Sequence, residues 1–217
     1  MSRFLIPGWR FVDLSGPAKQ LIVVGYPHTS RRDFVLAQAA RFRKGRDMLS
    51  LVAETEFYGL RGAVLRMLGC MPVPRASGAG LTDEIVKILA HRPQTSLGIC
   101  PEAGIEWRSA WRTGYWVIAM ITGIPVCYVS FDYLRRCVIL HEPVQMTGDP
   151  EVDLAHARSL YSPVTALRPD DAAPIVFSEA WCVDLHRMQR QRQLWAQMRL
   201  SSEVGHHDLS APTKSEM

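Results

Sequence analysis

Residues 25 to 34, which read GYPHTSRRDF, bring together side chains that could move a proton. His28 is followed five positions later by Asp33, and an ionised aspartate can hold one imidazole nitrogen while the other stays free to accept a proton. Ser30 and Asp33 also match a capping box, in which both side chains bind the backbone of a helix's first turn. Two interpretations follow. His28 is either a general base oriented by Asp33, or a turn residue beside an aspartate that only caps a helix.

The position of this segment favours the catalytic interpretation. The apolar run from Leu21 to Gly25 precedes it and predicts a strand buried on both faces. Open α/β sheets bind ligands outside the carboxyl ends of such strands. No obvious serine or cysteine nucleophile lies beside His28, because Thr29 and Ser30 are too close to it along the backbone. We therefore expect His28 to take a proton from a substrate hydroxyl, which then attacks an activated acyl carbon.

Short apolar runs alternate with segments of helical periodicity along the chain. The expected strands are 21–25, 48–53, 71–73, 96–100, 126–131 and 137–140, and the expected helices are 33–43, 59–68, 83–90, 114–122, 150–160 and 184–200. Thr82 is expected to cap the third helix. The alternation predicts an α/β fold: a single domain, residues 1–200, with a largely parallel mixed sheet flanked by helices. Residues 201–217 are polar and expected to be a disordered tail.

Two segments raise the question of membrane contact. Residues 114 to 131 carry no charge over nearly the length of a membrane span, but Gly123 and Pro125 interrupt them. A helix ending at Gly123 and a buried strand from Val126 is the favoured interpretation, with a span as the alternative. The helix over 184–200 has an apolar side and four arginines. It either packs on the domain with a solvated basic face, which we favour, or lies on an anionic membrane surface.

Bulk composition indicates a globular protein. The 217 residues are 47% hydrophobic and 21% charged, which argues against wholesale disorder. The formal net charge of +4 favours contact with anionic groups such as phosphates or lipid headgroups. The cysteines form no C-x-x-C pair, so we expect buried thiols in a reducing compartment, neither disulfides nor zinc ligands; they are Cys70, Cys100, Cys127, Cys137 and Cys182. The first 20 residues contain no apolar stretch of signal-peptide length, so secretion is not expected.

The segment PHTSRRDF resembles the first motif of the glycerolipid acyltransferases, the 1-acylglycerol-3-phosphate acyltransferase family, usually written N-H-x-S-x-x-D. His28, Ser30 and Asp33 match this motif, and Pro27 replaces the asparagine. The resemblance extends over most of the chain, from about Gly8 to Tyr133. It implies the acyltransferase fold of that family.

Two later blocks carry the rest of the resemblance. The stretch FYGLRGAVLRMLGCMPVPRAS is similar to the second block, and Arg75 falls on the arginine that the family uses near the acceptor phosphate. The stretch ICPEAGIEWRSAWRTGYWVIAMITGIPV is similar to a block that normally reads P-E-G-T-R, followed by a helix and the fourth motif. Glu102 matches, whereas Gly104 and Ile105 replace the threonine and arginine. Arg108 lies three residues further on and is a candidate replacement for that charge.

The resemblance implies an O-acyltransferase of phospholipid biosynthesis. The donor would be acyl-CoA or an acyl-carrier protein, and the acceptor a lysophospholipid, by default lysophosphatidate. His28 would be the general base and Asp33 would orient it. Arg31, Arg32, Arg75 and Arg108 would neutralise an anionic headgroup, and Glu102 would position the acceptor or order the site. The substrate-binding candidates are Ser30, Arg75, Glu102, Gly104 and Arg108.

The implied chemistry needs no metal or organic cofactor, and no nucleic-acid partner is expected. Because the substrates are amphiphiles, we expect a cytoplasmic protein attached peripherally to a membrane surface. Two alternatives stay open. Ile105 in place of an arginine suggests the same chemistry on an acceptor without phosphate. A non-catalytic membrane- or lipid-binding protein could also retain the fold.

Overall fold

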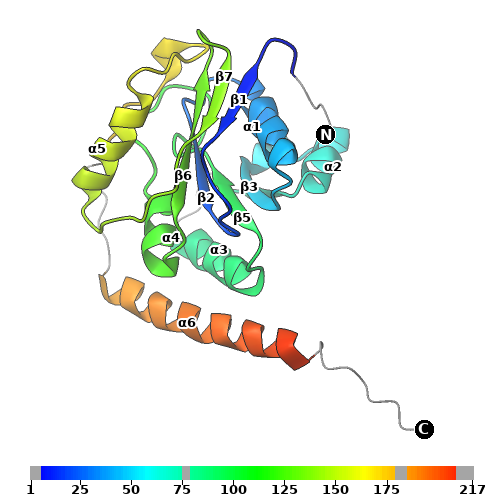
Figure 1. Cartoon of the computed structure of the whole chain (residues 1–217), viewed down its shortest axis with the longest axis vertical. Helices are drawn as coiled ribbons and strands as arrows, with labels where there is room; N and C mark the ends of the chain where they lie inside the picture. The colour runs from blue at the N-terminus through cyan, green and yellow to red at the C-terminus, as the bar shows by residue number, and fades with distance from the viewer. Residues whose placement is uncertain (1–5, 75–78, 179–184, 209–217) are drawn as a thin grey trace.

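A single sheet runs through the centre of the molecule (Figure 1). The computed structural model describes residues 6–74, 79–178 and 185–208, and within them seven strands form this sheet. The strands are β1 (Arg10–Asp13), β2 (Ile22–Tyr26), β3 (Met48–Ala53), β4 (Cys70–Val73), β5 (Ser96–Ile99), β6 (Val126–Asp132) and β7 (Cys137–Leu140). Their order is β1-β7-β6-β2-β5-β3-β4, and all neighbours are parallel except β6 and β7.

Helices cover both faces of the sheet. They are α1 (Arg31–Lys44), α2 (Gly59–Met67), α3 (Ala79–His91), α4 (Gly114–Thr122), α5 (Pro150–Tyr161) and α6 (Leu185–Asp208), with the 3-10 turns η1 (Glu54–Glu56) and η2 (Pro169–Asp171). Figure 1 shows α1 and α2 on one side of the sheet and α4 and α5 on the other. The α/β fold with a mostly parallel mixed sheet flanked by helices is therefore confirmed.

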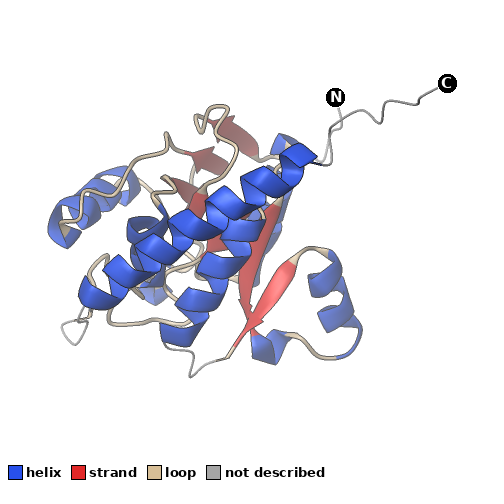
Figure 2. Ribbon diagram, turned by 90° about the horizontal axis from the view of Figure 1, so that it is seen from below, coloured by secondary structure: helices blue, strands red, loops and turns tan. Residues whose placement is uncertain are grey.

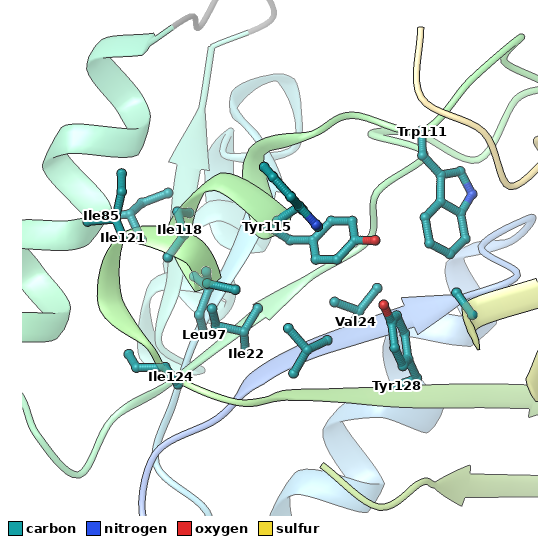
Figure 3. Packing of buried hydrophobic residues seen from close by; sticks show 14 of the residues in the cluster. Ile22, Val24, Ile85, Leu97, Trp111, Tyr115, Ile118, Ile121, Ile124 and Tyr128 are labelled. Carbon is teal, nitrogen blue, oxygen red and sulfur yellow. The ribbon is translucent and has the colours of Figure 1, made fainter. Parts of the chain in front are cut away.

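Strand β2 lies in the middle of the sheet, where both of its faces are covered. Ile22 and Val24 are fully buried in the cluster formed with α3, α4 and α5 (Figure 3). Val23 packs against the opposite cluster, which includes residues of α1, β6 and β7. At Gly25 a Cβ atom would lie 3.1 Å from the ring of Phe131, so the absence of a side chain lets β2 and β6 pack closely. This packing fixes the end of β2, where the candidate site begins.

Most predicted elements are present, with corrections at the ends of two helices and one strand that was not predicted. Helix α3 begins at Ala79, so Thr82 lies inside the helix and the predicted cap there is wrong. Strand β1 was not predicted; it joins the edge of the sheet by pairing in parallel with β7. Helix α6 continues to Asp208, past the predicted end at Leu200, so the expected tail does not begin at residue 201. Residues 209–217 lie outside the described residues.

The uncharged segment 114–131 is a helix followed by a strand. Helix α4 ends at Thr122, Gly123 takes the left-handed conformation with a φ of 66°, and the fully buried strand β6 begins at Val126. This confirms the favoured interpretation of the segment. In the part of the chain that the structure describes, no helix has both the length and the apolar character needed to cross a bilayer.

Helix α6 packs on the domain, as favoured from the sequence. It lies against α3 and α4 (Figures 1 and 2). Met188 is buried in the large core cluster, and Trp195 and Met198 pack against it. Arg192 Nε donates a hydrogen bond of 2.6 Å to the carbonyl oxygen of Met120 on α4. The apolar side of this helix is thus used for packing.

The cysteines within the described residues are free thiols. Cys70, Cys127 and Cys137 are buried, as expected, and Cys100 is half-buried. Burial raises the pKa of the Cys70 thiol to about 11 and that of Cys127 to about 12. Cys182 lies outside the described residues.

Candidate functional site

Three neighbouring parallel strands end at the same edge of the sheet. Strand β2 lies between β6 and β5 and is parallel to both, so the segments that follow the three strands meet there. These segments carry His28 after β2, Glu102 after β5 and Tyr133 after β6. Binding sites in open α/β sheets occupy this position.

The first turn of α1 holds Asp33 through the predicted capping box. Ser30 is the N-cap in an extended conformation, and its hydroxyl accepts a hydrogen bond of 2.9 Å from the Arg32 N–H. The carboxylate oxygen Oδ2 of Asp33 accepts hydrogen bonds of 2.8 Å from the N–H groups of Thr29 and Ser30. Asp33 is only 1% exposed and lies in the first turn of α1. The capping box is confirmed, and it fixes the carboxylate.

His28 lies next to this carboxylate. Its Nδ1 atom is 3.4 Å from Oδ2 of Asp33, within the range of an ion pair. Nδ1 is fully buried and makes no hydrogen bond to any described residue. Because Nδ1 is covered, the 17% exposure of the side chain comes from its other atoms. The two residues therefore meet in space, as expected from the sequence.

Tyr133 holds the second oxygen of the same carboxylate. Its hydroxyl donates a hydrogen bond of 2.5 Å to Oδ1 of Asp33, across 100 positions of sequence. Burial and the Asp33 carboxylate raise the pKa of Tyr133 well above its usual value, so the hydroxyl stays protonated and remains a donor. The sequence did not predict this contact. The sequence feature that could have indicated this contact is the position of Tyr133, directly after β6, the strand that neighbours β2.

Glu102 connects the loop that carries His28 to the segment around Ala173. It is only 2% exposed, Oε2 accepts a hydrogen bond of 2.5 Å from the His28 N–H, and Oε1 accepts one of 3.0 Å from the Ala173 N–H. Burial raises the pKa of Glu102 above its usual value, although both hydrogen bonds oppose that shift. Of the two roles expected for this residue, the contacts support ordering of the site over direct binding of an acceptor.

The irregular segment after α5 closes over the loop that carries His28. The Arg168 N–H donates to the Thr29 hydroxyl at 3.2 Å, and the Tyr26 hydroxyl donates to the Ala173 carbonyl at 2.9 Å. Burial, with the nearby charge of Glu102, raises the pKa of Tyr26 to about 12. No sequence pattern pointed to this segment, because it belongs to no periodic element.

An arginine-lined cavity opens beside the first turn of α1. It has a volume of about 370 Å³ and begins at Ser30, two residues after His28. Three arginines line it: two belong to α1, and Arg168 belongs to the irregular segment that follows α5. Its full lining is Ser30, Arg31, Arg32, Ile105, Leu167 and Arg168. Three guanidinium groups and a helix N-terminus make this cavity suited to an anionic group.

A more apolar groove adjoins the cavity. Its volume is about 540 Å³, and Arg32 and Leu167 line both spaces. Tyr133, which binds Asp33, forms part of its wall. The lining consists of Ile6, Trp9, Arg32, Val35, Leu36, Tyr133, Arg136 and Leu167. The two spaces together offer a charged and an apolar compartment at the first turn of α1, and His28 and Asp33 themselves are not among the lining residues.

The substrate-binding residues expected from the sequence are only partly gathered here. Ser30 lines the cavity, as does Ile105 at the position of the missing arginine. Gly104 and the exposed Arg108 belong to the loop after β5, with the Arg108 guanidinium beside Gly104, and neither contributes to the described lining of the cavity. Arg75 lies outside the described residues. Arg168 was missed, and it supplies the third arginine of the cavity.

Side chains near His28 are poor candidates for a covalent nucleophile. Thr29 is fully buried and its hydroxyl accepts the Arg168 N–H. Burial, with the charges of Glu102 and Asp33, raises the pKa of the Cys100 thiol well above its usual value and keeps it protonated. Within the described ranges, no three or more His, Cys, Asp or Glu side chains cluster as metal ligands would. The arrangement is suited to abstraction of a proton from a bound molecule.

No protein-family model, curated protein or solved structure matches the chain.

Proposed function

We propose that this protein is an O-acyltransferase that moves a fatty acyl group from an acyl thioester to the hydroxyl of a lysophospholipid. The observation that carries the proposal is His28 beside the buried Asp33 at a strand end, two residues before Ser30, which lines a cavity with three arginines. The motif resemblance of residues 27–34 to the glycerolipid acyltransferases points to the same reaction.

The proposed reaction needs one base and no covalent intermediate. His28 directs Nδ1 toward Asp33, which leaves Nε2 as the acceptor for the proton of the substrate hydroxyl. The hydroxyl oxygen attacks the thioester carbonyl carbon as its proton passes to Nε2. The tetrahedral intermediate then collapses, the C–S bond breaks, and the thiolate leaves with the proton from His28. Asp33 stabilises the imidazolium that exists between these two transfers.

The two compartments account for an amphiphilic substrate. Arg31, Arg32 and Arg168 would bind an anionic headgroup through charge-assisted hydrogen bonds. Arg168 would offset the loss of the family arginine at Ile105, since both residues line the same cavity. The apolar groove beyond Leu167 would take an acyl chain, because its wall is largely hydrophobic. Lysophosphatidate is therefore the default acceptor, and peripheral contact with a membrane is proposed.

A phosphate-free acceptor is the second candidate, favoured by the apolar Ile105 side chain in the cavity. One assay distinguishes the two candidate acceptors. Purified protein is mixed with acyl-CoA or acyl-carrier protein and a set of lysolipids with and without phosphate, and free thiol is followed. We expect release with lysophosphatidate, and release only with phosphate-free lysolipids would establish the second candidate.

The control for this assay is a matched pair of histidine variants. His28→Ala should abolish thiol release, whereas His156→Ala, at an exposed position of α5, should leave it unchanged. Equal release by wild type and His28→Ala would reject the enzymatic proposal and favour a lipid-binding protein that retains the fold.

A further inference from the structure

Helix α2 exposes an apolar stripe. Leu60, Val64 and Met67 are spaced four and three residues apart, which places them on one face of the helix. Leu60 is 83% exposed and Met67 80%, values far above those expected for large apolar side chains. The inner side of α2 is occupied by the buried residues Gly62 and Leu65. The stripe therefore lies on a different face of α2 from the one that packs on the domain.

Helices α2 and α6 differ in where their apolar residues point. In α6 the apolar residues Met188, Trp195 and Met198 face the core cluster. In α2 the apolar residues of the stripe point to solvent, at the periphery of the molecule (Figure 1). The main apolar side of α6 is therefore packed on the domain, whereas Leu60 and Met67 of α2 remain largely exposed.

The charges on α2 are all positive. The sequence of the helix, GLRGAVLRM, contains two arginines and no acidic residue. Arg66 is exposed and stacks over the ring of Phe57 at 5.4 Å. Arg61 lies on the same helix and pairs with Glu56 in the preceding turn η1. An apolar face flanked by arginines is the arrangement of helices that lie in the interface of a bilayer with anionic lipids.

The stripe is connected to the candidate site. Glu56 contacts Arg61 of α2 and also Arg31, whose Nη2 lies 3.4 Å from Glu56 Oε1. Arg31 in turn lines the arginine-lined cavity at the first turn of α1. A surface held by α2 would therefore lie next to the cavity proposed to take the headgroup.

We propose that α2 is the element by which this protein docks on a bilayer containing anionic lipids. The apolar stripe inserts among the acyl chains, and the exposed Arg66 contacts the headgroups. A lysolipid could then reach the cavity without leaving the interface. The proposal deepens the proposed acyl transfer and rests on it for the lipid nature of the partner.

Vesicle co-sedimentation tests the docking surface. The protein is mixed with vesicles of phosphatidylcholine containing phosphatidylglycerol, and separately with vesicles of phosphatidylcholine alone. We expect binding to the anionic vesicles. The double variant Leu60→Ser/Met67→Ser should weaken it about a hundredfold, since burial of each side chain contributes about tenfold. Both side chains are largely exposed, so the variant should fold as wild type does, which circular dichroism checks.

A matched control uses the exposed leucines of α6. Leu194→Ser/Leu200→Ser likewise replaces two exposed apolar side chains, which are 47% and 64% exposed, and should leave vesicle binding unchanged. Wild type that stays in the supernatant, or equal binding by wild type and the α2 variant, would overturn the proposal. So would equal losses in the α2 and α6 variants, or a wild-type dimer that the α2 variant disperses without any effect on vesicles.

An activity measurement separates this proposal from the proposed function. With a short-chain lysolipid dispersed as monomers, the α2 variant should transfer acyl groups at the wild-type rate, whereas with vesicle-borne lysolipid it should be slower. Anionic vesicle binding without acyl transfer by wild type would reject the enzyme and leave the docking surface standing. A variant equally active on both forms of acceptor would reject the docking surface alone.

Discussion

Tyr133→Phe removes the hydroxyl that donates a hydrogen bond to the buried Asp33 carboxylate. In the wild type that hydroxyl donates a hydrogen bond of 2.5 Å to Oδ1 of Asp33. The other oxygen keeps its two hydrogen bonds from the N–H groups of Thr29 and Ser30. The substitution therefore leaves the capping box in place and withdraws the donor that fixes the carboxylate from the opposite side.

The expected magnitude follows from the charge of the acceptor. A hydrogen bond to a charged group contributes about 1.5–3 kcal/mol, whereas a neutral one contributes about 0.5–1.5 kcal/mol. For a chain of this size the larger loss lowers Tm by about 3–12 °C. Because a less firmly held Asp33 orients His28 less well, kcat should also fall, by about tenfold, with little change in the KM for the acyl donor.

Tyr161→Phe is the matched control. Tyr161 is buried and its hydroxyl donates to the neutral carbonyl of Val24 at 2.9 Å. Thermal unfolding and steady-state thiol release are measured on both variants. We expect the control to lose less stability and to keep its kcat. If Tyr133→Phe is no less stable than Tyr161→Phe and equally active, the role assigned to the Tyr133 hydroxyl is wrong.

Three further predictions concern the cavity, the buried carboxyl and α2. Arg168→Ala should raise the KM for a phosphate-bearing acceptor about tenfold and change kcat little, because a charge-assisted hydrogen bond is lost at the headgroup; an unchanged KM would remove Arg168 from the binding site. Burial raises the pKa of Glu102 above its usual 4.5, so the folded state binds the proton to a higher pH than the unfolded chain does. The unfolding free energy of wild type relative to Glu102→Gln, measured in urea, should therefore fall as pH rises from 4.5 through the raised pKa, and a rise would contradict the assignment. Gly62→Ala should destabilise by about 1–3 kcal/mol, since its Cβ would lie 2.6 Å from the Phe57 carbonyl carbon, whereas Gly80→Ala, with open space around it, should not; thermal unfolding of both variants decides this.

The central part of the fold was predictable because its signals are local. Buried parallel strands read as continuous apolar runs, and β2, β3, β6 and β7 were located within a residue or two. The edge strand β1 was missed because its sequence, RFVD, is short and largely exposed, and only pairing with β7 makes it a strand. Helix α3 begins three residues before the predicted cap at Thr82, since the small residues there tolerate a helix as well as a loop.

In the candidate site too, local contacts were predictable from the sequence and long-range contacts were not. The pairing of Ser30 with Asp33 depends on a spacing of three residues within one turn, so the sequence was sufficient to predict it. Tyr133 and Arg168 reach the site from 100 and more positions away, and their contacts depend on the order of strands in the sheet and the path of an irregular segment. No short-range pattern encodes either contact. Glu102 was located by its motif, but only the structure shows both of its oxygens bound to backbone N–H groups.

The most direct test of the proposed chemistry is a rapid-mixing measurement of thiol, ester and protein mass on one sample. Direct transfer with His28 as the base predicts no thiol burst and no acylated protein when acyl thioester is added alone. Adding lysophosphatidate should give free thiol and acyl ester in equal amounts with wild type, and neither with His28→Ala. An acylated protein in the absence of acceptor, or equal ester formation by wild type and His28→Ala, would contradict it.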